Sequence, residues 1–383
     1  MAKLDADWLT SNATRAVFQL LEGPGHQVFA VGGCVRNALL SEPVHDIDLS
    51  TDARPEQVIG FAKSAGLQAI PTGIEHGTVT VLSGGEPYEI TTFRRDLETD
   101  GRRAVVAFSD RIEDDARRRD FTMNALYADG RGNLHDPLGG LPDLIARRVR
   151  FIEDPVQRIR EDYLRSLRYF RFHAWYGDQS DGFDADALDA IARNLEGLST
   201  LSKERIGSEL KRLLEAPNPA TALAGMRTTG VLAAILPGAD DTALAPLIHV
   251  EEQAGAVPSA MRRLAVLGGG NLVEDLRLSR KESDVLRDIR AGTGVSAGEA
   301  GYRFGAERGR DAMMVLAAST GVPFDPKVLK AVERGGGHNF PVKAADLMPG
   351  LEGAALGAAL KRLEADWIAS DFKLGKDELI AKL

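Results

Sequence analysis

The sequence predicts an α/β (α+β) unit at the N-terminus, followed by a long region built only of helices. Short β-like runs alternate with helical segments over about the first 120 residues, which is typical of a sheet covered by helices. After Pro155, apolar residues recur at steps of three and four, and helical spacing continues to Leu383. A chain of 383 residues exceeds one ordinary domain. We therefore expect three parts, over 1–145, 146–215 and 216–383.

Apolar spacing and turn residues define the expected elements of the first part. Residues 5–22 have helical spacing and stop at Gly23-Pro24-Gly25, because glycine and proline end helices. Ser83-Gly84-Gly85 separates two strand-like runs and therefore predicts a hairpin. The expected strands are 28–31, 46–49, 78–82 and 88–93, and a further helix is expected over 55–65.

The next stretches of the chain follow different patterns. Residues 95–115 are charged and poor in apolar periodicity, so we expect a loop there. Beyond them, one amphipathic helix is expected. Its apolar positions are Val156, Ile159, Tyr163, Leu167 and Phe170.

The charge of the chain is acidic overall but unevenly distributed. The formal net charge is −9, which by itself disfavours a nucleic-acid partner. Between Arg147 and Arg171, however, eight arginines outnumber four acidic residues, and this stretch carries a net charge of +4. A locally basic surface can hold a phosphate backbone. We therefore take Arg168 and Arg171 as candidate RNA contacts.

Cysteine content and hydropathy exclude several classes of protein. Cys34 is the only cysteine, which excludes an intrachain disulfide and a multi-cysteine zinc site. Residues 1–19 contain no apolar core of a secretion signal. No window reaches about 18 uninterrupted apolar residues, the length that a membrane span needs. We expect a cytoplasmic protein with no membrane association and no obligate protein partner.

Two aspartates on a predicted strand are the first candidates for catalysis. Asp46 and Asp48 are separated by one residue, and residues i and i+2 of a strand point to the same face. Paired carboxylates supply the hard oxygen ligands that Mg²⁺ prefers. Two such ions, about 3.5–4 Å apart, can activate an attacking hydroxyl and stabilise a leaving pyrophosphate. Glu89, on another predicted strand, is a candidate third carboxylate, although the solvated face of a hairpin explains it nearly as well.

A glycine turn upstream provides the expected phosphate contacts. Gly32 and Gly33 follow a predicted strand, and without side chains their backbone N–H groups can approach a triphosphate. Arg36 could grip phosphate oxygens with two donors. Asp-x-Asp and Gly-Gly are weak signals when they occur alone. Their ordered combination with an arginine is far less common.

Asp162 and Arg165 form a candidate base-reading pair. Positions i and i+3 of a helix share a face, so the two side chains would project together. A carboxylate that accepts from an exocyclic amine, beside an arginine that donates to ring acceptors, can read the edge of a base. The alternative is a surface ion pair that contributes little.

Six motifs occur in an order that resembles a known family. They are Gly32-Gly33-x-x-Arg36, Asp46-x-Asp48, Arg118-Arg119-Asp120-Phe121-Thr122-x-Asn124-Ala125, Asp136-Pro137-x-Gly139-Gly140, Glu161-Asp162-x-x-Arg165 and Glu204-Arg205-Ile206. Together they are similar to the bacterial class II tRNA nucleotidyltransferases, which are the CCA-adding enzymes and their poly(A) polymerase relatives. The motifs span roughly residues 30–210, and the remainder of the chain matches more loosely.

The resemblance implies a nucleotidyltransferase head with a five-stranded mixed sheet, then an all-α neck, body and tail. These would occupy 1–145, 146–215 and 216–383, with the last part binding tRNA. The implied site residues are Asp46 and Asp48 for the metals; Gly32, Gly33 and Arg36 for the triphosphate; Arg119, Asp120 and Asn124 for the sugar and the site floor; and Asp162 and Arg165 for selecting CTP or ATP.

The resulting prediction is an enzyme that adds CMP, CMP and AMP to the 3′ end of tRNA from CTP and ATP. It would use Mg²⁺ and no nucleic-acid template. A poly(A) polymerase, or an enzyme that adds only CC or only A, is the alternative within the family. A non-catalytic tRNA-binding module is an alternative of another class. A phosphohydrolase that uses His45 and Asp46 is a further alternative. In such an enzyme the His-Asp pair lies on helices, whereas here the two residues begin a predicted strand.

Overall fold

The chain, seen here as a computed structural model that describes residues 3–100 and 103–383, forms two compact units. The first comprises Met1–Arg205 and Gly225–Ala234. The second comprises Ile206–Ala224 and Ile235–Leu383, and the boundary falls within helix α10. The three-part division expected from the sequence is finer than these units and stays a prediction.

A mixed sheet of seven strands forms the core of the first unit, in the order β3-β4-β5-β2-β1-β8-β9. Strands β2 and β5 are parallel, and the other neighbouring strands are antiparallel. The mixed sheet is confirmed, but the expected number of five strands is wrong, because the two-residue strands β8 and β9 extend the sheet beyond β1. The strands are β1 Val28–Val31, β2 Ile47–Thr51, β3 Gln68–Gly73, β4 Thr78–Ser83, β5 Glu86–Thr92, β8 Tyr127–Ala128 and β9 Leu134–His135.

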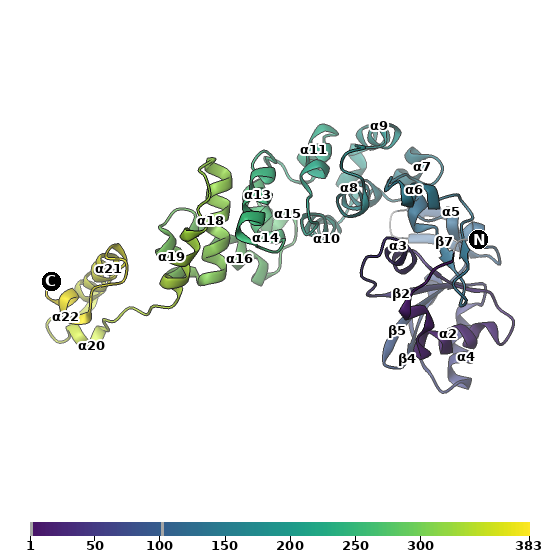
Figure 1. Cartoon of the computed structure of the whole chain (residues 1–383), viewed down its shortest axis with the longest axis horizontal. Helices are drawn as coiled ribbons and strands as arrows, with labels where there is room; N and C mark the ends of the chain where they lie inside the picture. Colours follow the sequence, from purple (N-terminus) through teal and green to yellow (C-terminus); the bar gives the residue numbers. More distant parts are fainter. Residues whose placement is uncertain (1–2, 101–102) are drawn as a thin grey trace. The chain divides into compact units, whose positions relative to one another are not determined.

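Helices α2 (Asn12–Glu22) and α4 (Pro55–Ser64) pack against this sheet (Figure 1). The helix expected over 5–22 is divided into α1 (Asp7–Thr10) and α2, because the Ser11 side chain caps the start of α2. The hydroxyl groups of Thr14 on α2 and Tyr88 on β5 lie 2.9 Å apart. Tyr88 therefore faces the helices, and the residue that follows it on β5 faces the opposite side of the sheet.

Two hairpins precede the helical part of the chain. The predicted hairpin is confirmed as β4 and β5, whose turn uses Gly84 and Gly85 at φ 61° and 86°, values that suit glycine. The loop expected over 95–115 is wrong, since this segment contains a second hairpin and a helix, although residues 101–102 lie outside the described residues. A two-stranded ribbon outside the main sheet need not alternate apolar and polar residues, so its period is hard to read. These elements are β6 Arg94–Asp100, β7 Arg103–Phe108 and α5 Ile112–Arg117.

The remaining elements of the first unit are helical, as predicted. The single helix expected between Val156 and Phe170 is in fact two, α7 (Pro155–Glu161) and α8 (Leu164–Tyr176), because Asp162 has extended backbone angles between them. The others are α3 Gly33–Leu39, α6 Leu141–Ile145, α9 Ala185–Arg193, and the 3₁₀ turns Ile74–His76, Thr122–Asn124 and Leu195–Thr200. Three helices contain residues of both units: α10 Lys203–Leu214, α11 Ala220–Thr228 and α12 Val231–Ile235.

The second unit contains only helices in its described residues. Glu251 and Arg263 are buried and joined by an ion pair of 2.6 Å, and Arg263 also donates to the backbone oxygen of Leu214 at 2.5 Å. This pair anchors the end of α10. No helix in the described part of the chain is long and apolar enough to cross a bilayer. The helices are α13 Leu244–Ala254, α14 Ala260–Leu267, α15 Leu272–Asp275, α16 Arg280–Gly292, α17 Ala297–Phe304, α18 Ala306–Thr320, α19 Lys327–Gly336, α20 Ala344–Leu347, α21 Gly353–Ala369 and α22 Lys376–Ile380.

Candidate active site

Acidic side chains gather on the two parallel strands at the centre of the sheet. The register of β2 and β5 places Asp48 directly beside Glu89. Asp46 lies two residues before Asp48, immediately before β2, and all three side chains are exposed. Glu89 therefore lies on the same face as Asp48, opposite to helix α2.

The charge of this acidic cluster is visible in the pKa of Asp48. Although the side chain is exposed, partial desolvation by the surrounding atoms and then the negative charge of Glu89 raise this pKa from 3.8 to about 6. Asp46 adds to the increase, and the positive charge of Arg119 opposes it. The four side chains therefore interact electrostatically. Within residues 3–100 and 103–383, no group of three or more His, Cys, Asp or Glu side chains is arranged to hold a metal ion.

Arg119 lies between these carboxylates and the glycine turn. Its Nη2 donates to Asp115 Oδ2 at 2.8 Å and to Ser50 Oγ at 3.2 Å, and its Nε donates to Tyr127 Oη at 3.1 Å. Gly32 has φ 72°, and a Cβ atom added there would lie 3.5 Å from Arg119 Nη1. The structure thus brings the predicted residues Gly32, Arg119 and Asp48 together.

Asp120, Asn124 and Arg36 form a buried polar chain that continues to α8. Asp120 Oδ1 accepts from Asn124 Nδ2 at 2.8 Å, and Asp120 Oδ2 accepts from Arg168 Nε at 2.8 Å. Arg36 Nη1 donates to Asn124 Oδ1 at 2.5 Å, and Arg36 Nη2 donates to Tyr176 Oη at 2.9 Å. Burial raises the pKa of Asp120, but the charge of Arg168 and these hydrogen bonds outweigh burial and hold the pKa well below its usual range. This series of hydrogen-bonded side chains links the turn after α5 and helix α3 to helix α8.

Three arginines with predicted ligand contacts lie in or next to this series of polar side chains. Arg36 is 7% exposed, its guanidinium donates to protein groups, and it lies 4.0 Å from the centroid of the Tyr176 ring. These contacts join helix α3 to Asn124 and to helix α8, and the phosphate contact expected for Arg36 stays a prediction. Arg168, a predicted RNA contact, is paired with Asp120. Arg171 lies 4.7 Å from the Phe172 ring centroid, and its RNA contact stays a prediction.

Asp162 and Arg165 are not paired with each other. Asp162 interrupts the helix, and its Oδ2 accepts from Arg205 at 2.7 Å. Arg165 Nη1 donates to Glu161 Oε2 at 2.6 Å, and Arg165 Nη2 donates to the backbone oxygen of Arg118 at 3.0 Å. The assumption of one continuous helix face is therefore wrong, while a role of either residue in base selection remains untested.

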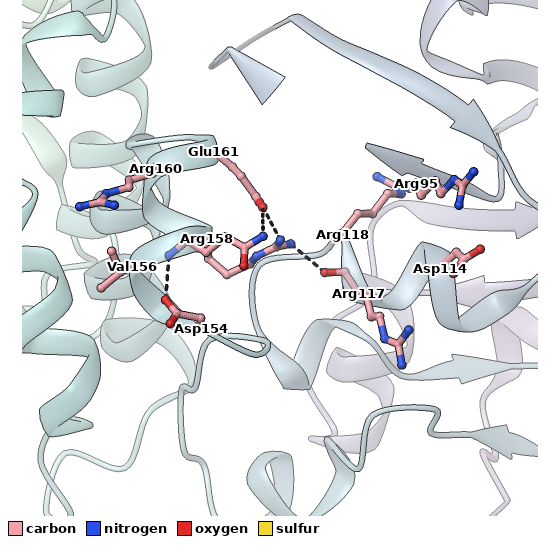
Figure 2. Close-up of a pocket in the computed structure, with 10 residues that line it drawn as sticks. Arg95, Asp114, Arg117, Arg118, Asp154, Val156, Arg158, Arg160 and Glu161 are labelled. Atoms are coloured by element: carbon pink, nitrogen blue, oxygen red, sulfur yellow. Dashed lines mark hydrogen bonds and ion pairs between the residues drawn. The ribbon is translucent and has the colours of Figure 1, made fainter. Parts of the chain in front are cut away.

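A cavity of about 840 Å³ lies between helix α7 and the segment around α5. Figure 2 shows Arg160 and Asp154 on the α7 side, and Arg95, Arg117 and Arg118 on the other. A volume of this size can hold a nucleotide-sized ligand. Five of the ten lining residues are arginines and three are acidic, so the lining favours an anion. The full lining is Arg95, Asp114, Arg117, Arg118, Asp154, Val156, Gln157, Arg158, Arg160 and Glu161.

Sequence reasoning missed three residues that hold this site together. Asp115 lies at the end of segment 95–115, where a loop is expected from the sequence, so no sequence pattern indicates a buried carboxylate there. Tyr176 is 140 positions from its partner Arg36, and no local pattern connects them. Arg205 belongs to one of the six motifs, which was a usable signal, but the motif alone does not show that its partner is Asp162.

Comparisons with known proteins agree with this geometry. Residues 28–150 match the family described as "Poly A polymerase head domain", and residues 183–242 match "Probable RNA and SrmB- binding site of polymerase A". A crystal structure of the Bacillus stearothermophilus CCA-adding enzyme in complex with CTP superposes with a TM-score of 0.74 at 29% identity, covering 94% of this chain and 93% of that one. The Thermotoga maritima CCA-adding enzyme complexed with tRNA, at 19% identity and a TM-score of 0.70, shares the fold.

Curated sequences give the same result. The CCA-adding enzyme of Geobacillus stearothermophilus is 39% identical over 225 residues, which are 58% of this chain and 54% of that enzyme. The mitochondrial CCA tRNA nucleotidyltransferase 1 of Mus musculus is 32% identical over 395 residues, which cover 97% of this chain and 90% of the mouse protein. Because this similarity extends over nearly the whole of both chains, the protein is a nucleotidyltransferase that belongs to the CCA tRNA nucleotidyltransferase family.

Proposed function

We propose that this protein adds CMP, CMP and AMP to the 3′ end of tRNA, with CTP and ATP as substrates. CCA addition is the activity named for the relatives that match nearly its whole length. The observation that carries the proposal is the position of Asp48 beside Glu89 and Arg119, next to the Gly32 turn. This arrangement supplies the carboxylates and the positive charge that transfer of a nucleotidyl group requires.

The donor groups present fit Mg²⁺, because Asp46 and Asp48 offer hard oxygen ligands close to the carboxylate of Glu89. When bound, Mg²⁺ supplies Lewis-acid activation of the attacking hydroxyl and of the leaving pyrophosphate. In the reaction, the tRNA 3′-oxygen forms a bond to the α-phosphorus, and the bond from that phosphorus to the pyrophosphate oxygen breaks. Arg119 places a positive charge beside the reacting phosphate, and the Gly32-Gly33 turn leaves room for the phosphate chain to approach.

Nucleotide choice is assigned to Asp162 and Arg165 by similarity to the family, and Arg165→Ala tests this assignment. The side chain donates to Glu161 and to two backbone oxygens, so its guanidinium has a fixed orientation. We expect incorporation of UTP or GTP relative to CTP to increase about tenfold or more, since one bidentate contact provides about 1–3 kcal/mol of discrimination. Single-nucleotide incorporation measures it. Arg193→Ala, which removes an exposed arginine of α9, serves as the control. Unchanged discrimination in the Arg165 variant would contradict the assignment.

One assay separates the related activities. The protein is incubated with tRNA transcripts that lack CCA, CA or A, together with each labelled triphosphate. Addition of two CMP and one AMP in order supports the proposal, whereas long A-tails independent of tRNA identify a poly(A) polymerase. Addition limited to CC or to A identifies the narrower enzymes, and absence of pyrophosphate release favours a tRNA-binding module. Phosphate release from phosphoesters that is lost in His45→Ala would instead support the phosphohydrolase.

A cytoplasmic location is also part of this proposal. Relatives from mouse, human and zebrafish are named mitochondrial, so the compartment differs among similar proteins. Fractionation of cells that express the chain, with detection by an antibody, would decide the location.

A further inference from the structure

Asp115 on helix α5 is a fully buried carboxylate that holds two consecutive arginines. Its side chain has 0% exposure. Oδ1 accepts from Arg118 Nε at 2.8 Å, and Oδ2 accepts from Arg119 Nη2 and from Tyr127 Oη, each at 2.8 Å. Burial raises the pKa of Asp115, but the charges of the two arginines outweigh burial and hold this pKa far below its usual range. The group is therefore a permanent anion inside the protein.

The two arginines that Asp115 holds lead to different parts of the site. Arg118 lines the cavity of Figure 2, whereas Arg119 lies next to the Gly32 turn and acts on the charge of Asp48. Asp115 therefore holds both Arg118, which lines the cavity, and Arg119, which lies near Asp48 on β2.

Ser50 on strand β2 forms hydrogen bonds to both Asp115 and Arg119. Its Oγ donates to Asp115 Oδ2 at 3.3 Å and accepts from Arg119 Nη2 at 3.2 Å. Ser50 lies two residues after Asp48 on β2, so both side chains belong to one face of the sheet. The guanidinium of Arg119 is therefore fixed by Asp115, Ser50 and Tyr127 relative to the carboxylates.

We propose that Asp115 is a positioning residue for nucleotidyl transfer, which fixes Arg119 beside the reacting phosphate without touching the substrate. This inference rests on the proposed function. A positive charge that is held in place before the reaction needs no reorganisation during it. A displacement of such a group by about 1 Å can cost about a hundredfold in rate. Loss of the Asp115 carboxylate therefore lowers kcat more than it raises the KM for the triphosphate.

Asp143 on α6 provides a matched control for a purely structural role. It is 3% exposed, and it accepts from Arg150 Nε at 2.9 Å, from Arg148 Nη1 at 3.5 Å and from Thr122 Oγ1 at 2.8 Å. It is thus a second buried aspartate with two arginines and a hydroxyl group. The part of the chain that the structure describes shows no hydrogen bond from Asp143 to Arg119, Ser50 or Asp48.

The test compares Asp115→Asn with Asp143→Asn in the full-length protein. Tm, kcat and the KM for CTP are measured with tRNA that lacks CCA. We expect Asp115→Asn to reduce kcat about a hundredfold with KM within about threefold, while Asp143→Asn lowers Tm and keeps kcat within about threefold. Loss of kcat in proportion to the loss of Tm in both variants, or a kcat within threefold in Asp115→Asn, overturns the inference.

A milder variant keeps the test decisive if Asp115→Asn does not fold. Tyr127→Phe removes one hydroxyl that bonds both Asp115 and Arg119, with little change in volume. We expect it to reduce kcat about tenfold with an unchanged KM, because the variant loses one hydrogen bond to each of the two charged groups whose positions it helps to fix. Full activity of this variant contradicts the inference. A parent protein without CTP incorporation refutes the proposed function instead, so the two failures are distinct.

Discussion

Replacing Asp48 by asparagine is expected to reduce incorporation of both CMP and AMP by about a thousandfold or more. The side chain belongs to the Asp46-x-Asp48 motif, and an amide cannot supply the same negative oxygen ligand to a divalent cation. A thousandfold loss corresponds to about 4 kcal/mol of transition-state stabilisation. Gel-based incorporation of labelled CTP and ATP into tRNA that lacks CCA measures the loss, and binding of tRNA should be largely unchanged.

Asp52 supplies the matched control for this experiment. It follows β2 directly, and its Oδ1 lies 2.8 Å from His26 Nδ1 and accepts from the backbone N–H of Gln27 at 3.0 Å. Asp52→Asn should retain incorporation, because this carboxylate does not belong to the acidic cluster. Strong CTP addition by the Asp46→Asn/Asp48→Asn double variant would refute the assignment of the catalytic pair.

Asp120→Asn is expected to lower the free energy of unfolding at pH 7 by about 3–5 kcal/mol, the usual result of breaking a buried ion pair. The carboxylate is 7% exposed and bonds Arg168, Asn124 and the backbone N–H of Phe121. Removing its charge turns the charge-assisted bond from Arg168 into a weaker bond to a neutral amide. Urea denaturation of both proteins measures the difference, and Asp189→Asn in an exposed ion pair should change stability little.

The lowered pKa of Asp120 determines how the difference in unfolding free energy between the parent and Asp120→Asn depends on pH. The folded pKa of Asp120 lies below the ordinary value of 3.8. Its contribution to stability is therefore fully present above that value and is lost as the pH falls toward the folded pKa. The difference in unfolding free energy between the parent and Asp120→Asn should stay constant from pH 7 to about pH 5 and become smaller at lower pH. A difference that increases on acidification would contradict this account.

The sequence could indicate which residues gather at the centre of the site because local patterns contain them, while their catalytic roles stay predictions. An Asp-x-Asp pair on a predicted strand and a glycine turn after a strand are arrangements of neighbouring residues, and the structure places Asp48, Gly32 and Arg119 together. Glu89 was a weaker prediction, yet the parallel register sets it beside Asp48.

What the sequence could not predict depends on distant partners or on breaks in a regular pattern. Arg36 donates to Asn124 and Tyr176, and no pattern in the sequence near Arg36 indicates these partners, while its predicted phosphate contact stays a prediction. Helical spacing continues through Asp162, although the backbone is extended there. Strands β8 and β9 have two residues each, which is too short for a period to be visible.

Desolvation and the nearby negative charges of Glu89 and Asp46, which together raise the pKa of Asp48, imply a trade-off between stability and activity. Its folded pKa of about 6 exceeds the ordinary 3.8, so between these values the folded chain binds more protons than the unfolded chain. Stability from this group therefore falls as the pH rises through that window, opposite to Asp120. When Asp46, Asp48 and Glu89 are ionised, their like charges repel one another and locally destabilise an otherwise well-packed sheet. Selection for heat resistance alone would favour neutral substitutions at these positions, and selection for catalysis would remove them.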